Sequence, residues 1–243
     1  MPDLPSARPT PSPVTTTRIT HTFSSRSFNK INLFDGPFDV QLYQNNDLNN
    51  NYTSVDIETE QSIQNFVSVN IEQNDTLIIR MMKKFKIDDK IHLTLLIIYQ
   101  QLDEIYIDGL INMQCLNPIQ TNHFRLYNHG TGFMKLKLNV NVLDAYFHSI
   151  GNVKLCGQVL NDTTIKSSSI GNIDCRNLLT RKINILSSGI GNVYLMAIDE
   201  INITSSGIGI VYYSGPLKKH IQTGLGSILD VTISPPIITE DFD

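Results

Sequence analysis

The sequence predicts an all-β protein, a parallel β-solenoid of about seven coils that follows a less regular, strand-rich N-terminal portion. The first observation is a repeated phrase: Ser-Ile-Gly-Asn-Val at 149–153 returns in similar form at 169–173, 189–193 and 207–211. The second is that apolar residues form columns when these repeats are aligned. The third is the absence of proline between Pro118 and Pro216, as strands paired on both edges require. A fixed period of about 20 residues is typical of stacked structural units.

Length and composition favour one domain between two polar ends. Residues 1–17 contain five of the ten prolines together with Ser and Thr, so we expect a disordered leader there. Residues 18–232 carry the apolar patterns and form one predicted β-solenoid domain, and residues 233–243 form an acidic C-terminal tail. Hydrophobic residues make up 41% of the chain, with Ile, Val, Thr and Tyr prominent, which favours strands over helices.

The N-terminal portion shows the two-residue alternation of half-buried strands. Phe38, Val40 and Leu42 alternate with polar neighbours after a predicted turn at Asp35-Gly36-Pro37. The same rhythm returns at 55–57, 67–71 and 77–79, and no helical period stands out. We therefore expect strands that cap or extend the solenoid.

From residue 91 onward the strands belong to the repeat. Each unit is anchored on its second glycine, or on the residue in that slot, at positions 111, 132, 151, 171, 191, 209 and 226. Two and four positions after the anchor stand mostly Met, Val, Ile, Leu and Cys. Six positions before it stand Ile105, Leu126, Ala145, Ile165, Ile185 and Ile203. One position before it stand Leu110, Thr131, Ile150, Ile170, Ile190, Ile208 and Leu225. We expect all four columns to face the core, because like residues stack on like in successive coils.

The remaining features of the repeat concern its turns and its end. The anchor glycines fit turns that need a positive φ, which a residue without a Cβ tolerates. Asn112, Asn152, Asn172 and Asn192 predict a ladder of stacked amides beside these turns. His220 and Asp230 enter inward columns only in the last coil, which no further coil covers.

The order of these phrases resembles the head GIN domain of the "putative auto-transporter adhesin" family, known mostly from bacteria. The resemblance rests on the repeated phrases, on the opening Phe-Asp-Gly-Pro-Phe-Asp-Val at 34–40, and on the closing segments 211–216 and 224–227. It covers roughly residues 19–231. It implies a β-solenoid that is exported or displayed at the cell surface and serves adhesion, and it brings no catalytic residues.

Two candidate sites lie in neighbouring columns of the first coils. Tyr106, Tyr127 and Tyr146 share an outward column and are a candidate ligand-binding row, although stacked aromatic residues also stabilise a ladder. Asp108, His129 and His148 share the next outward column and are a candidate metal site, because two imidazoles and a carboxylate suit Zn²⁺. The alternative interpretation is a polar, solvated turn column, and we expect no cofactor.

The function predicted from these patterns is non-enzymatic: a scaffold or adhesion-type binding module that presents flat faces to a protein or a glycan. The competing hypothesis is a carbohydrate-active β-helix enzyme, a polysaccharide lyase or hydrolase. Such a site needs several carboxylates on one face. The outward column three positions past the anchor holds a single acidic residue, Asp174. Glu104, Arg125 and Asp144 share another column, which is more typical of solvated ion pairs.

Charge, cysteine content and the N-terminal residues limit the possible partners and the possible location of the protein. The net charge of −4, without a basic stripe, argues against nucleic acid, and no apolar run is long enough for a transmembrane segment. Three cysteines give no disulfide or zinc framework and are expected as buried thiols. The first residues show no secretion signal, so this pattern leaves the location open between the cytosol and the cell surface that the resemblance implies. A homo-oligomer is also left open.

Overall fold

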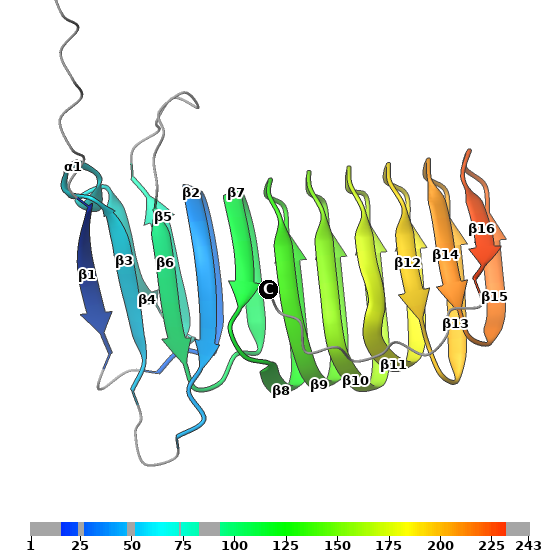
Figure 1. Cartoon of the computed structure of the whole chain (residues 1–243), viewed down its shortest axis with the longest axis horizontal. Helices are drawn as coiled ribbons and strands as arrows, with labels where there is room; N and C mark the ends of the chain where they lie inside the picture. The colour runs from blue at the N-terminus through cyan, green and yellow to red at the C-terminus, as the bar shows by residue number, and fades with distance from the viewer. Residues whose placement is uncertain (1–15, 24–26, 48–51, 73, 83–92, 232–243) are drawn as a thin grey trace, which may run out of the picture.

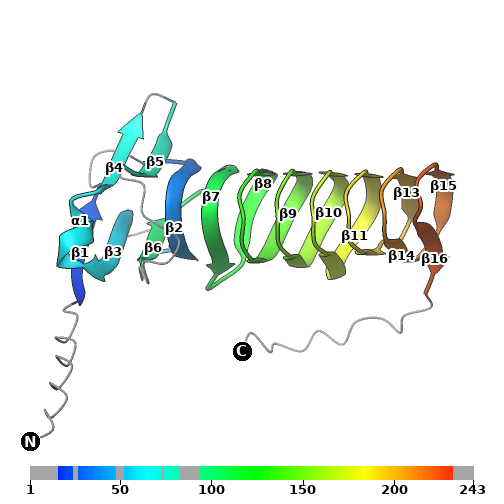
Figure 2. The same cartoon turned by 90° about the horizontal axis from the view of Figure 1, so that it is seen from above.

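The computed structural model describes residues 16–23, 27–47, 52–72, 74–82 and 93–231. They form an elongated parallel β-solenoid of about six turns, whose coils lie side by side along the long axis (Figures 1 and 2). A single helical turn, α1 (Gln61–Gln64), is the one α-helix in this part of the chain. The predicted leader and acidic tail fall mostly outside the described residues, but Thr16 and Thr17 already belong to the first strand.

The solenoid has two sheet faces that share one core, and the described strands are parallel except for three antiparallel pairs at the N-terminal end. The first face contains, in spatial order, β1 (Thr16–Thr22), β3 (Ser54–Glu60), β6 (Thr94–Tyr99), β2 (Lys30–Gln44), β7 (Glu104–Cys115), β9 (Met134–Phe147), β10 (Val153–Ser167), β11 (Ile173–Ser187), β12 (Val193–Met196), β14 (Ile210–Ser214) and β16 (Ser227–Asp230). The second face adds β4 (Val67–Glu72), β5 (Thr76–Met81), β8 (Ile119–Asn128), β13 (Glu200–Ser205) and β15 (Leu217–Gln222). The long strands β2, β7, β9, β10 and β11 bend and contribute to both faces.

Three of the four predicted columns are confirmed as core columns. Residues six positions before the anchor pair directly from coil to coil, and Ile185 lies between Ile165 and Ile203 with 4% of its surface exposed. In the columns two and four positions after the anchor, the members from β7 to β12 are all buried. His220 and Asp230 are exposed on the last described coil, as its position at the end of the stack predicts.

The prediction for the fourth column was wrong. Ile150, Ile170, Ile190 and Ile208 do stack in register through isolated bridges, but each is 51–55% exposed. Each lies an odd number of residues from the inward positions on both sides, so the alternation of a strand turns it outward. Apolar character alone misassigned these residues to the core.

The tight turns explain the repeated glycine. Gly191 has a φ of +135°, and a Cβ there would come within 2.1 Å of the carbonyl oxygen of Gly171 in the preceding coil. Because both the backbone angle and the close approach of the coils exclude a side chain, glycine recurs in this slot.

The asparagines form a ladder of a different kind from the one predicted. The Oδ1 of Asn152 accepts a hydrogen bond from the backbone N–H of Asn172, and the Oδ1 of Asn172 accepts one from Asn192, both at 2.9 Å. Asn192 continues the series to the N–H of Ile210 at 2.9 Å. The amides therefore satisfy backbone donors of the next coil, instead of bonding to one another.

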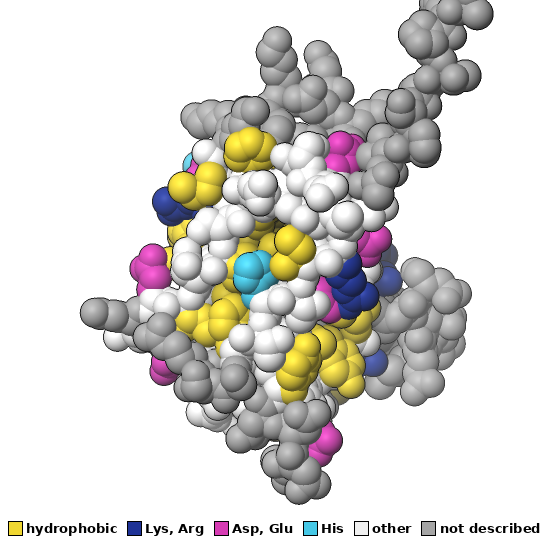
Figure 3. All heavy atoms as spheres, turned by 90° about the vertical axis from the view of Figure 1, so that its left-hand side faces the viewer, with side chains coloured by type: hydrophobic (Ala, Val, Ile, Leu, Met, Phe, Trp, Pro, Cys, Tyr) yellow, Lys and Arg dark blue, Asp and Glu magenta, His cyan; other side chains and the backbone are white. Residues whose placement is uncertain are grey.

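The N-terminal portion continues the solenoid on both faces. β2 pairs with β7 in the same register as later coils, with Ile31 opposite Ile105 and Val40 opposite Met113. β6, β3 and β1 extend the first face, and β5 and β4 extend the second. Seen end-on, the described residues of this end carry charged side chains of both signs and form no patch of one charge (Figure 3).

Candidate functional site

The predicted tyrosine row exists on the second face. Tyr106, Tyr127 and Tyr146 come from β7, β8 and β9 and pair directly in register. The rings of Tyr127 and Tyr146 are stacked, with centroids 5.0 Å apart and an interplanar angle of 9°. Those of Tyr106 and Tyr127 lie 6.5 Å apart at 38°. The spacing of one coil thus brings the three side chains together, as their shared column predicts.

Charged groups lie over both ends of this aromatic row. Phe34 continues the row 5.6 Å from Tyr106, and the Arg80 guanidinium lies 4.7 Å from the centre of the Phe34 ring. At the other end the Lys166 Nζ lies 5.3 Å from the centre of the Tyr146 ring. Because neighbouring rings and cations occupy the ring faces, the row presents ring edges and phenolic hydroxyls to a partner.

The three tyrosines of the row are half-buried, and Tyr127 lies between the other two. Burial, followed by the negative charge of Glu104, raises the pKa of Tyr127 above its ordinary value. The phenol therefore stays neutral at physiological pH and acts as both a hydrogen-bond donor and an acceptor.

The three predicted metal ligands stand in one column of the repeat. The two histidines make different contacts. The His129 ring stacks on Tyr106 at 5.4 Å, and the His148 ring lies 6.1 Å from His129. The Nδ1 of His148 is within 2.7 Å of the Ser168 hydroxyl. In the part of the chain that the structure describes, no three His, Cys, Asp or Glu side chains gather as a metal-binding group, Asp108 with His129 and His148 included. The metal hypothesis stays a prediction.

A shallow groove continues from the tyrosine row along the second face. It consists of two adjoining depressions of about 300 Å³ and 350 Å³, which share Lys166 and Leu186 in their walls. The first reaches back to His129 and Tyr146, and the second reaches Lys219 on β15. Hydroxyl and amide side chains from β10, β11 and β13 supply most of the remaining polar lining. No Asp or Glu occurs among the described residues that line it, so the charged groups of the groove are cationic.

A second aromatic pair, which the sequence analysis did not single out, lies on the first face. Tyr194 and Tyr212 stack with centroids 4.8 Å apart at 6°, and the Arg176 guanidinium lies 4.5 Å from the Tyr194 ring. Both tyrosines stand in one outward column, so the signal was present in the alignment. It was missed because that column was searched only for carboxylates.

Carboxylates of the solenoid are held in local pairs. Arg176 donates hydrogen bonds to both carboxylate oxygens of Asp174, at 3.0 and 2.7 Å. Burial tends to raise the pKa of Asp174, but these hydrogen bonds and the charge of Arg176 outweigh it, and the pKa is lowered. Asp174 therefore lacks the raised pKa that suits a general acid. Asp144 lies 2.7 Å from the Nε2 of His123.

The fold and this surface define the class of the protein: a parallel β-solenoid with a half-buried aromatic row and a cationic groove. Residues 27–216 match the model of the family described as "Putative auto-transporter adhesin, head GIN domain". The chain belongs to this family, as its repeated phrases indicate. No curated protein matches the sequence. Among the described residues, no helix has the length and apolar character to span a membrane.

Three solved bacterial structures share this fold. A "putative adhesin" from Bacteroides fragilis has a TM-score of 0.78 and 23% identity, over 90% of this chain and 99% of that one. A "putative adhesin" from Parabacteroides distasonis has a TM-score of 0.60 and 17% identity, over 88% and 97% of the two chains. A "putative lipid binding protein" from the same species has a TM-score of 0.55 and 13% identity, over 87% and 96%. At these identities the likeness concerns the fold.

Proposed function

We propose that the chain is a non-enzymatic, adhesion-type binding module that holds an extended glycan chain along its second face. The observation that carries this proposal is the continuity of the tyrosine row with the groove beside it. Through Tyr146 and Lys166, which line the groove, one continuous surface crosses the coils from β7 to β15, with polar groups set among apolar ones.

The chemistry of this surface suits a polyhydroxylated chain. Phenolic hydroxyls, serine and threonine hydroxyls, imidazoles and the amides of Asn184 and Asn202 offer both donors and acceptors. Lys166 and Lys219 line the groove and, among the described residues, no Asp or Glu does, although Glu200 accepts a hydrogen bond from the lining Asn202; the two lysines favour an acidic glycan. Because ring faces are covered, recognition uses hydroxyls and ring edges more than stacking.

The enzymatic alternative has less support. A lyase or hydrolase needs carboxylates that converge on the bound chain, whereas those of Asp174 and Asp144 are bound to neighbouring side chains. Membership of an adhesin family supports a binding role, and it also supports display at the cell surface or export.

Affinity electrophoresis in gels that contain a polyuronate or a neutral glucan tests this proposal. We expect the polyuronate to retard the protein more strongly, and Tyr127→Ser to reduce that retardation severalfold. Tyr194→Ser is the matched control, because it removes an equally stacked ring from the opposite face. Equal retention by the two variants, no retardation of the wild type, or release of reducing ends from either polymer would contradict the proposal.

A further inference from the structure

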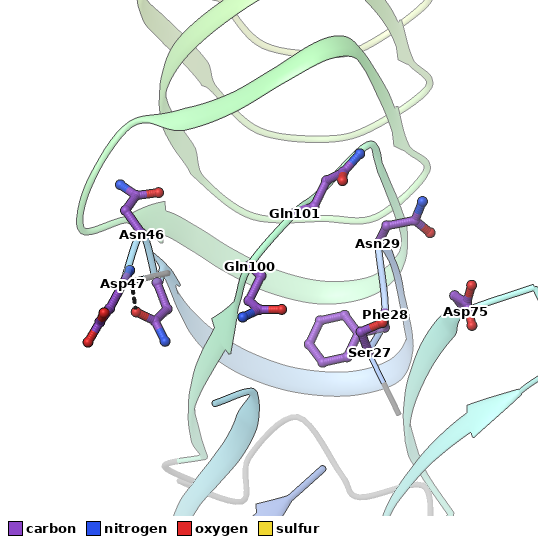
Figure 4. Close-up of a pocket in the computed structure, with 9 residues that line it drawn as sticks. Ser27, Phe28, Asn29, Asn46, Asp47, Asp75, Gln100 and Gln101 are labelled. Carbon is purple, nitrogen blue, oxygen red and sulfur yellow. Dashed lines mark hydrogen bonds between the residues drawn. The ribbon is translucent and has the colours of Figure 1, made fainter. Parts of the chain in front are cut away.

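A separate pocket of about 460 Å³ lies where the N-terminal portion joins the first coil (Figure 4). Its volume is within the range of small-molecule sites, about 300–1,000 Å³. Four segments form it: 27–29 before β2, 45–47 after β2, Asp75 before β5, and 100–101 after β6. It lies apart from the groove of the second face, because the two share no lining residue.

Backbone hydrogen bonds tie these segments together. The N–H of Asn29 donates to the carbonyl of Asp75 at 3.0 Å, and the N–H of Asn45 donates to that of Tyr99 at 2.6 Å. The Nε2 of the buried Gln44 donates to the carbonyl of Gln100 at 2.8 Å. The pocket is therefore preformed, which lowers the entropic cost of binding.

Asp103 fixes the orientation of two amides in the pocket wall. Its carboxylate accepts hydrogen bonds from the Nδ2 of Asn29 at 2.9 Å and from the Nε2 of Gln101 at 3.0 Å. A carboxylate accepts and does not donate, so the NH₂ groups of both amides must face it. Their carbonyl oxygens are then available to accept hydrogen bonds from a ligand, which adds acceptors to this wall.

The charge of the pocket is opposite to that of the groove. Asp47 and Asp75 line it, and no Lys, Arg or His occurs among its described lining residues. The buried Phe28 ring lies at its centre in Figure 4, next to Gln100. An acceptor-rich, negative wall repels anions and suits a ligand that donates hydrogen bonds from hydroxyl or ammonium groups.

We propose that this pocket binds a polyhydroxylated ligand without negative charge, of the size of one or two sugar rings. The amide oxygens of Asn29 and Gln101 accept from its hydroxyls, and Asp75 gives preference to a ligand that carries an ammonium group. This second site is independent of the glycan surface proposed for the second face.

Titration calorimetry and saturation-transfer NMR on the full chain test the proposal with three probes: glucosamine, methyl glucoside and glucuronate. We expect glucosamine to bind most tightly, methyl glucoside several-fold more weakly, and glucuronate not at all. Asp75→Asn should weaken glucosamine at least fivefold and leave methyl glucoside within about twofold. Asparagine tolerates the φ of 54° at this position, so the fold is retained.

Two further variants complete the experiment. Asp162→Asn removes an exposed carboxylate from β10, outside the pocket, and should change nothing. Gln101→Ala removes an exposed acceptor and should weaken glucosamine and methyl glucoside alike. The proposal is overturned if glucuronate binds as well as glucosamine, if none of the probes binds at tens of millimolar, or if both pocket variants bind like the wild type.

Discussion

Two isoleucines in consecutive repeat units provide a sharp test of the solenoid register. Ile185 lies between Ile165 and Ile203 and is 4% exposed, whereas Ile170 is 51% exposed at the corner. Each stands in a column of isoleucines, so the two positions have the same residue type and similar neighbours in the adjacent coils. The structure predicts that the same substitution, Ile→Asp, has very different effects at the two positions.

The expected magnitudes follow from burial. Ile185→Asp loses the transfer free energy of a fully buried aliphatic side chain, about 2–3 kcal/mol. It also leaves a carboxylate without partners in the core, which costs several kcal/mol more. The total approaches the whole stability of a typical domain, about 5–15 kcal/mol, so this variant should fail to fold. In Ile170→Asp only the buried half of the isoleucine side chain is lost. We expect this to lower the free energy of unfolding by about 1 kcal/mol, or Tm by roughly 2–4 °C.

Thermal unfolding followed by far-UV circular dichroism measures the difference. Since Ile185→Asp is expected in the insoluble fraction, the alanine pair gives a measurable comparison: Ile185→Ala should cost about 2–5 kcal/mol and Ile170→Ala about 1 kcal/mol or less. Similar losses at the two positions would refute the register and, with it, the placement of the corner isoleucines on the surface.

Three further predictions concern other parts of the solenoid. Gly191→Ala should lower Tm by more than Ile170→Ala does, because its Cβ meets a backbone oxygen at 2.1 Å and its φ is positive; equal melting curves would refute this. In the native protein a thiol reagent should modify Cys156 first. Burial raises the pKa of Cys115 to about 11 and also raises that of the fully buried Cys175, so both thiols stay protonated and out of reach. Simultaneous reaction of all three cysteines would contradict this prediction. The metal hypothesis predicts about one bound zinc per dialysed chain, lost in the double variant His129→Ala and His148→Ala; unchanged binding in that variant would remove it.

Much of the architecture could be predicted from local patterns. The repeated glycine phrase indicated the coil length, and the column that contains Ile185 was assigned correctly. Tyr106, Tyr127 and Tyr146 were placed together because residues one period apart in a solenoid become neighbours about 4.8 Å apart. The period alone therefore determined which side chains form the row.

Other features depended on contacts that a period does not contain. The row of Ile150 and Ile170 was placed in the core because apolar identity was given more weight than strand alternation. The asparagine ladder turned out to bond to the backbone, since the neighbouring coil presents an N–H group to each amide oxygen. The position of Phe34 and Arg80 over the tyrosine row also comes from the pairing of β2 and β5.

The sequence by itself determined the stacking of the coils, because each coil must pair with the next and the same residue type therefore recurs in the same place. Only the tertiary structure decided where the pocket forms, because it requires segments that have no common period. The pocket joins Asp75 to Gln101 through bonds to Asn29 and Asp103. The groove follows periodic columns of β10, β11 and β13, but the sequence did not show that this part of the face is hollowed. Both reflect distances between side chains, which the repeat does not encode.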